Sequence, residues 1–369
     1  MPGIKNCYAG KILRVDLSTG AITTEDFGDK YTDLFIGGRG VSSKLLYDEV
    51  PPEVAPFDAE NLLIFSPGAL HGTGVPAASR TTVATRSPLT NMHGDGHAGA
   101  TWGGELKRAG YDLLIIRGRA EKPVCLLIDD DKVELRDASN LWGLLTSQTH
   151  ARLRHEIGDH ELCTVEVGPA GEKMVRLAAA FHNGSDKGTT ARCGMGAVMG
   201  SKNLKAIATR GTKDVGVADI AALKDAYQGY LDTIAVDPYC PPATKYGTCR
   251  FMLHRVKFGI HGAENWQYGE YDWKKLDPEV FRSDYQVKAG ACVTCPVRCR
   301  RDYRITSGPF AGTTAKVEWE TIARSMTCGI KDPESVIAWS NICNHYGLDI
   351  EGTGDSVAFA MECFGRGIL

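Results

Sequence analysis

Long hydrophobic runs are missing from this sequence. Nowhere do about 18 apolar residues follow one another, as a membrane-spanning helix would require. The first residues, Met1 to Cys7, show no apolar stretch behind a positive start and so do not resemble a secretory leader. These absences predict a soluble protein of the cytoplasm without membrane insertion.

An excess of charge of one sign is missing as well. The 42 Lys and Arg residues stand against 45 Asp and Glu, a net charge of -3, so no broad basic surface is offered to nucleic acid. Internal repeats and low-complexity segments are also absent, which excludes solenoids. A chain of 369 residues that is 43% hydrophobic is instead expected to form two or three domains with real cores.

Glycine and cysteine are abundant, with 42 and 12 residues. In a reducing compartment twelve cysteines are unsuited to a disulfide framework, so a close cluster of them indicates metal ligands or a catalytic site. The scattered cysteines are expected to be small core residues, since free cysteine is among the most buried residue types. They include Cys7, Cys125, Cys163, Cys240 and Cys249.

The first half, to about residue 210, reads as short apolar or β-branched runs between glycine turns, which predicts strands. The expected strands are residues 11–17, 62–65, 81–85, 113–116, 124–128 and 175–180. Residues 16–20 and 129–132 read as hairpin turns. Helices are expected at 40–49, 102–109 and 147–157, the last capped by Ser147.

After Lys213 the pattern changes to helical periodicity, as in residues 220–227, 320–326 and 334–346. Residues 356–364 read as a buried helix near the end of the chain. The polar stretch 209–217 suits a domain boundary. The sequence therefore predicts an α+β protein with a sheet-rich domain at 1–210 and a mainly helical domain at 211–369.

The strongest chemical signal is the C-x2-C-x3-C motif formed by Cys292, Cys295 and Cys299. Three thiolates on a tight loop can face one centre, and a four-iron cluster normally takes four of them. The spacing differs from the two separated pairs of a structural zinc site, but zinc and redox-active thiols remain alternatives. A fourth ligand could come from Cys328, Cys343 or Cys363, or from beyond residue 369.

The second signal is glycine density in three stretches of the first half, residues 72–80, 94–100 and 184–196. Glycine lets backbone N–H groups approach a ligand closely, and an embedded arginine offers a fork for phosphate. None of the stretches fits a P-loop or a Rossmann turn. The pattern favours loops that hold a large phosphorylated cofactor, with ordinary turns as the alternative.

Several longer runs carry a resemblance to a known family. They are residues 86–90, 109–112, 121–124, 167–172 and, most extensively, Gly196 to Ala208 (GAVMGSKNLKAIA). Together with the cysteine triplet they closely resemble the tungsten-containing aldehyde ferredoxin oxidoreductases, in order, over essentially the whole chain.

The resemblance implies a double-sheet base, here residues 1–210, carrying a tungsten or molybdenum bis-molybdopterin, with magnesium as a possible bridge between the pterin phosphates. It implies a 4Fe-4S cluster on Cys292, Cys295 and Cys299, and Glu320 as the catalytic residue that moves a proton. Family members are longer than this chain, so we expect the second domain to be truncated and a carboxy-terminal segment or partner chain to be missing. The implied pterin contacts are Arg80, His97, Ala98, Gly99, Gly188, Thr189, Ala191, Arg192, Asn344, Gly347, Leu348 and Asp349.

Four positions depart from the family pattern. His97 stands where Asn is common, and Asn344 replaces an aspartate. Ala338 and Asn341 occupy the places of the Glu-x-x-His that binds a metal at a dimer interface in some members, so dimerisation through that metal is not expected, although a homo-oligomer of another kind stays open.

The resemblance implies oxidation of an aldehyde to a carboxylic acid, with electrons leaving to ferredoxin or a ferredoxin-like subunit. One alternative is a family member that works reductively on an aromatic acyl-CoA or a carboxylic acid. The other is a non-catalytic electron-transfer or assembly subunit whose cluster is completed by a partner chain.

Overall fold

The computed structural model describes residues 6–99, 101–184, 188–260, 262–269 and 272–369. By its internal contacts the chain divides into two compact units. The first comprises residues 1–227 with Cys292–Thr294 and His345–Leu348, and the second comprises Gln228–Ala291, Cys295–Asn344 and Asp349–Leu369.

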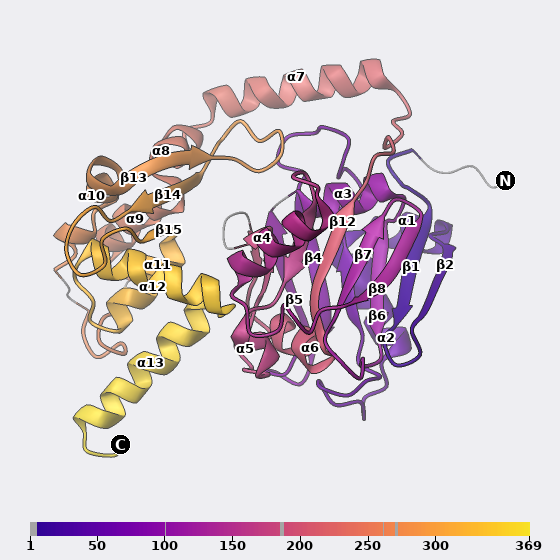
Figure 1. Cartoon of the computed structure of the whole chain (residues 1–369). Helices are drawn as coiled ribbons and strands as arrows, with labels where there is room; N and C mark the ends of the chain where they lie inside the picture. Colours follow the sequence, from indigo (N-terminus) through magenta and orange to yellow (C-terminus); the bar gives the residue numbers. More distant parts are fainter. Residues whose placement is uncertain (1–5, 100, 185–187, 261, 270–271) are drawn as a thin grey trace. The chain divides into compact units, whose positions relative to one another are not determined.

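Two 6-stranded sheets frame the first unit (Figure 1). The first sheet has the order β2-β1-β6-β3-β4-β5, with β1 and β6 parallel and the other neighbours antiparallel. Its strands are β1 (Lys11–Asp16), β2 (Ala21–Asp26), β3 (Leu63–Ser66), β4 (Arg80–Arg86), β5 (His93–Gly99) and β6 (Leu113–Arg117).

The second sheet has the order β11-β10-β9-β12-β7-β8, with β12 and β7 parallel and the other neighbours antiparallel. Its strands are β7 (Val124–Asp129), β8 (Lys132–Asp137), β9 (Cys163–Glu166), β10 (Ala180–His182), β11 (Gly188–Thr190) and β12 (Leu204–Arg210). In each sheet a glycine-containing strand, β5 or β11, lies at one edge.

The main core of this unit lies between the two sheets. Leu63 and Phe65 of β3 point into it together with Val165 of β9. Ile64 of β3 points the other way, into a second core beneath α2. Because both faces of the sheet are covered, β3 is a continuous apolar run rather than an alternating one.

Helices cover the outer faces and fill the ends of this core. Those of the first unit are α1 (Asp29–Phe35), α2 (Gly38–Glu49), α3 (Trp102–Ala109), α4 (Thr146–Ile157), α5 (Pro169–Glu172) and α6 (Met195–Ser201). Helix α2 packs on the first sheet and α4 on the second. Trp102 of α3 and Met199 of α6 belong to the core between the sheets, where both are fully buried.

The second unit is mainly helical, and its core includes Phe281, Tyr303 and Ile322. The helices after residue 211 are α7 (Ile220–Val236), α8 (Cys240–Tyr246), α9 (Phe251–Phe258), α10 (Pro278–Val280), α11 (Trp319–Thr327), α12 (Pro333–Tyr346) and α13 (Ile350–Gly365). A 3-stranded antiparallel sheet joins β13 (Gln286–Gly290), β14 (Arg300–Arg304) and β15 (Thr314–Lys316). Over the described residues, no helix combines the length and apolarity needed to cross a bilayer.

The predicted α+β class is confirmed, as are both hairpins and the helices at 40–49 and 102–109. Other expectations were wrong. Residues 175–179 are not a strand, and β10 begins only at Ala180; Ala178 forms a single bridge to Leu348 and packs against Ala197 of α6. The sheet formed by β13, β14 and β15 was not predicted.

Two helix predictions need correction in detail. Ser147 lies inside α4, whose N-cap is Leu145, and the Ser147 hydroxyl is 2.7 Å from Nδ1 of His345. The helix predicted at 356–364 exists as part of α13 but is not buried, since Phe359 and Phe364 are 61% and 74% exposed.

Candidate cofactor site

The two edge strands β5 and β11 come so close that side chains would not fit between them. A Cβ atom on Gly96 would lie 2.7 Å from the carbonyl oxygen of Ala191, and one on Gly188 would lie 2.6 Å from that of Gly99. Real Cβ atoms do not approach oxygen so closely, so glycine is required at both positions. The glycines predicted in a loop at 94–100 thus lie in a strand, as far as Gly99. They bring two of the three predicted cofactor segments together.

Ala98 and Thr189 belong to the same pair of strands. The Ala98 side chain is buried at 1% exposure and lies toward Gly188, so this residue could offer a cofactor only its main chain. Thr189 is half-buried on β11, opposite Phe181.

Arg80, Gly99 and Cys292 meet at one end of β5. Arg80 is the register partner of Gly99 on β4, and its exposed guanidinium donates from Nη1 to the carbonyl oxygen of His97 at 3.1 Å. A Cβ atom on Gly99 would lie 2.9 Å from Sγ of Cys292 and 3.7 Å from Nε of Arg80. The first unit therefore places one predicted cluster cysteine beside two predicted pterin residues.

The side chain of His97 lies on the opposite face of β5 from Ala98, among charged groups. Its Nε2 is 2.8 Å from Oδ2 of Asp95 and 2.5 Å from Nη2 of Arg39, and its Nδ1 is 3.1 Å from the Thr82 hydroxyl. Burial lowers the pKa of His97; Asp95 opposes this shift, and Arg39 and Arg80 add to it. The imidazole is therefore neutral near pH 7.

Arg39 and Asp95 were missed by the sequence reasoning. Asp95 stands two residues before His97, so strand alternation could have placed both on one face of β5. Arg39 is far from them in sequence, and only the packing of α2 on β5 brings it there.

The second predicted pterin segment ends in an unusual turn. Arg192, Cys193 and Gly194 have φ values of 65°, 52° and 73°. The Gly194 N–H donates to the Arg192 carbonyl at 2.6 Å. Such left-handed conformations cost about 1–3 kcal/mol for each residue with a side chain and concentrate at functional sites. Residue 100 and residues 185–187, which also belong to the predicted glycine segments, lie outside the described residues.

The carboxy-terminal pterin segment falls partly in the first unit. Gly347 has a φ of 82°, and a Cβ there would lie 2.8 Å from the Gly168 nitrogen. Its carbonyl accepts from the Ala179 N–H at 2.9 Å, and Leu348 forms a β-bridge with Ala178. Glycine at 347 is therefore explained by a left-handed turn against another backbone.

Asn344 and Asp349 belong to the second unit. Asn344 lies near the end of α12. Asp349 is buried at 4% exposure and caps α13, accepting from the N–H groups of Glu351 and Gly352 at 3.3 and 3.4 Å. This capping role could have been predicted, because Asp is favoured just before a helix.

The cysteine triplet is divided between the units, with Cys292 in the first and Cys295 and Cys299 in the second. Within the described residues, no three His, Cys, Asp or Glu side chains form a group that could hold a metal ion. The cluster therefore stays a prediction from the motif.

The candidates for a fourth cluster ligand differ in burial. Cys328 and Cys343 are buried, which raises the pKa of both thiols, that of Cys343 to about 12. Protonated core thiols are poor ligands. Cys363 is half-buried on α13. Cys240 on α8, expected in a core, is also half-buried. Burial and the Asp237 carboxylate raise the pKa of Cys240, and Cys295 adds to this shift.

Glu320 lies in the first turn of α11, two residues after the N-cap Glu318. The Oε2 atom of Glu320 is buried. A carboxylate in this position is stabilised by the helix dipole whether or not it also handles a proton.

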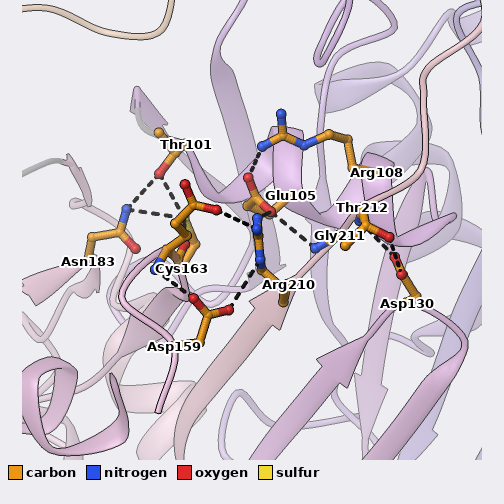
Figure 2. Close-up of polar contacts among 11 residues, drawn as sticks. Thr101, Glu105, Arg108, Asp130, Asp159, Cys163, Asn183, Arg210, Gly211 and Thr212 are labelled. Atoms are coloured by element: carbon orange, nitrogen blue, oxygen red, sulfur yellow. Dashed lines mark hydrogen bonds and ion pairs between the residues drawn. The ribbon is translucent and has the colours of Figure 1, made fainter. Parts of the chain in front are cut away.

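A separate polar cluster surrounds Glu105 of α3 (Figure 2). The Glu105 carboxylate is 3% exposed, pairs with Arg108, and lies 3.4 Å from Nη1 of Arg210 and 3.1 Å from the Gly211 nitrogen. Arg210 also contacts Asp159 and Glu161. This network ties α3 to the end of β12, and each of its carboxylates contacts an arginine.

Beside this network lies a cavity of about 650 Å³, with Cys163 in its lining. The Cys163 sulfur is 2.9 Å from the Thr101 hydroxyl and 3.7 Å from the Asn183 amide nitrogen (Figure 2). The thiol is 6% exposed, so the sequence prediction of a core cysteine is confirmed here. We assign this cluster a structural role.

Comparison with known proteins gives matches over nearly the whole chain. The family model for the aldehyde ferredoxin oxidoreductase N-terminal domain matches residues 12–211, and the model for domains 2 and 3 of the same family matches residues 226–369. The tungsten-containing aldehyde ferredoxin oxidoreductase of Pyrococcus abyssi is 39% identical over 365 residues, which cover 98% of this chain and 59% of that protein.

Two further relatives have other names. The WOR-like subunit of the aliphatic sulfonate oxidoreductase of Pyrococcus furiosus is 31% identical over 98% of this chain and 60% of its own length. The solved active-site complex BamBC of benzoyl coenzyme A reductase, bound to 1,5-dienoyl-CoA, contains a chain that is 31% identical with a TM-score of 0.87, covering 99% of this chain and 57% of that one.

This chain thus spans about 59% of the length of the curated aldehyde oxidoreductases that it matches. Both family models apply to it, in order, across nearly all of its residues. The chain belongs to the aldehyde ferredoxin oxidoreductase family.

Proposed function

We propose that this chain forms the pterin-binding base and part of the active site of a tungsten- or molybdenum-dependent oxidoreductase that converts an aldehyde to a carboxylic acid. The observation that carries this proposal is the meeting of Arg80, Gly99 and Cys292 beside the close approach of β5 and β11. Backbone N–H groups and arginine side chains can donate hydrogen bonds to the phosphates of a cofactor there.

The residues of the first unit fit a bis-pterin cofactor. Edge strands have main-chain groups on one side that no neighbouring strand uses, and β5 and β11 are both edge strands of the described sheets. Glycine at 96 and 188 lets these two strands approach each other, and glycine at 99 leaves room beside Cys292 and Arg80. Arg80 and Arg192, both exposed, supply forks suited to phosphate, which magnesium could bridge.

When bound, the metal and pterin supply two-electron redox chemistry. An aldehyde and water become a carboxylic acid, and two electrons and two protons leave. Glu320 would accept one proton at its carboxylate. Cys292, Cys295 and Cys299 would hold a 4Fe-4S cluster with a fourth ligand from another segment or chain. Ferredoxin or an iron–sulfur subunit in the cytoplasm would receive the electrons.

The reductive alternative has a specific observation in its favour. The benzoyl coenzyme A reductase chain is as similar in sequence as the sulfonate relative and matches this fold at a TM-score of 0.87. Under this alternative the same base would serve reduction of an aromatic acyl-CoA. The aldehyde relatives are more similar, at 37–39% identity, which favours the oxidative reaction.

The test measures tungsten, molybdenum, pterin and iron in protein purified anaerobically from cells that make the cofactor. We expect metal, pterin and iron together, with viologen reduction that depends on an aldehyde. Reduction of an aromatic acyl-CoA without aldehyde activity would select the alternative. Iron without tungsten, molybdenum or pterin would refute the enzyme and indicate a non-catalytic subunit.

Cys292→Ser tests the cluster within the same experiment. We expect this variant to lose most of its iron, because one thiolate ligand is removed. Cys7→Ser is the matched control, since Cys7 is also half-buried but lies outside the motif, and it should keep its iron. Equal iron in both variants would contradict the cluster assignment.

A further inference from the structure

Arg39 has an organised guanidinium beside the proposed cofactor site. It lies in the first turn of α2, and its Nε donates to Oδ2 of Asp95 at 2.5 Å. Its Nη2 is 2.5 Å from Nε2 of His97. The side chains of Asp95 and His97 on β5 thus contact the Nε and Nη2 atoms of the guanidinium.

The imidazole of His97 lies between Arg39 and two other polar side chains. Its Nε2 is 2.5 Å from Nη2 of Arg39 and 2.8 Å from Oδ2 of Asp95, and its Nδ1 is 3.1 Å from the Thr82 hydroxyl. Burial lowers the pKa of His97, so the ring adds no positive charge that would repel the guanidinium. His97 and Asp95 together hold Arg39 in place.

The far edge of the guanidinium is available to a ligand. The Arg39 side chain is 63% exposed, and its Nη1 group has no hydrogen-bond partner in the part of the chain that the structure describes. Arg80 approaches the same histidine from its main-chain side, donating to the His97 carbonyl. Two guanidiniums against one carboxylate, Asp95, leave a net positive charge around a neutral histidine.

The amino-terminal end of α2 adds to this positive field. Its N-cap is Gly37, no side chain caps it, and no acidic residue lies in its first turn. Uncapped N–H groups at a helix start attract anions. Gly38 has a φ of 54°, and a Cβ there would lie 3.5 Å from the Thr82 hydroxyl, so this turn packs directly on β4.

An ordinary surface ion pair explains this arrangement less well than a binding site for an anion does. A pair between Arg39 and Asp95 alone would be worth little and would need neither a neutral histidine nor an uncapped helix. Lys44 and Asp48 on the same helix form such a plain pair.

We propose that Arg39, held by Asp95 and His97 at the start of α2, binds a phosphate monoester group of the pterin cofactor. This inference rests on the proposed function, to which it adds a cofactor contact that the family resemblance did not supply. His97 and Asp95 act as positioning residues for Arg39.

The first test uses inorganic phosphate as a probe on the cofactor-free chain. We expect millimolar phosphate to raise the thermal midpoint of the wild-type chain and of Lys44→Gln, but not of Arg39→Gln. Arg39→Lys should respond weakly, because it keeps the charge and loses the fork. No phosphate response in the wild type, or an equal response in Arg39→Gln, would overturn the proposal.

The second test measures pterin and metal content after purification from cofactor-producing cells. Arg39→Gln should hold at least about tenfold less pterin and tungsten or molybdenum than wild type at limiting cofactor, with unchanged iron. Asp95→Asn should show a smaller loss. Full pterin in Arg39→Gln would overturn the proposal. A wild type without pterin but with the phosphate response would instead refute the proposed function alone.

Discussion

Burial decides the charge of several single residues in the first unit. It raises the pKa of Glu166 to about 8 and lowers those of His71 and His182 to about 4 and about 3. His182 is fully buried, packs edge-on against Trp102 at 6.0 Å, and has no partner for either ring nitrogen among the described residues. Such a group stabilises the fold only while it stays neutral.

The change His182→Phe should therefore make the protein less sensitive to acid. Between its ordinary pKa of 6.5 and its folded value of about 3, the unfolded chain binds a proton that the folded chain refuses. Stability is fully present above pH 6.5 and falls with decreasing pH, by about 2 kcal/mol at pH 5. Urea unfolding at pH 7.5 and pH 5 should show a difference about 2 kcal/mol smaller in the variant.

The exposed His155 on α4 offers the matched control. His155→Phe should leave the dependence of the unfolding free energy on pH unchanged. If His182→Phe keeps the full wild-type dependence, the buried histidine is not a source of acid sensitivity.

At the scale of elements, the close approach of two edge strands from different sheets makes the proposed site. Strand β5 shows its small residues to β11 and its polar residues to α2, so one strand serves the glycine contact and the Arg39 cluster. This alternation follows from the two-residue period of a strand.

Gly96→Ala should disrupt this element pair. The new methyl group would lie 2.7 Å from the Ala191 carbonyl oxygen, so we expect a loss of about 1–3 kcal/mol in the free energy of unfolding and a loss of bound pterin. Gly229→Ala on α7 is the control, because nothing lies within 4 Å of its added Cβ. It should be neutral or stabilise by up to about 1 kcal/mol. Unfolding and pterin assays that cannot distinguish the two variants would argue against a tight contact.

At the scale of the whole molecule, two units carry separate hydrophobic cores. The first family-model match ends at residue 211 and the second begins at residue 226. The predicted domain boundary at residue 210 lies near the end of the first match and remains a proposal. The chain crosses between the units more than once. The short segments Cys292–Thr294 and His345–Leu348 belong to the first unit, whereas the residues before and after each segment belong to the second.

The two cores should unfold as separate cooperative transitions in calorimetry. Ile116→Val and Ile337→Val each remove one methyl group from a fully buried isoleucine, in the first and second core respectively. Each change should cost about 0.5–1.5 kcal/mol and shift only one transition. A single transition that both variants lower equally would mean that the units unfold as one.

The sequence by itself determined several strands of the first unit, several helices and the family, because these depend on local patterns. Apolar runs such as Leu113–Ile116 predicted strands, and the cysteine motif and the run from Gly196 to Ala208 are readable without any packing. It failed where burial or strand partners depend on distant residues, as in the exposed α13 and the unpredicted sheet of β13, β14 and β15.

Only the tertiary structure decided what surrounds the candidate site. The sequence predicted a loop for the glycines of β5. Glycine favours a turn and also permits the close approach of another strand, and the sequence does not distinguish these two reasons. Arg39 is separated from His97 by 58 positions, and its role arises only when α2 packs on β5. Contacts between segments far apart in the chain depend on the closure of the whole fold, which no local pattern records.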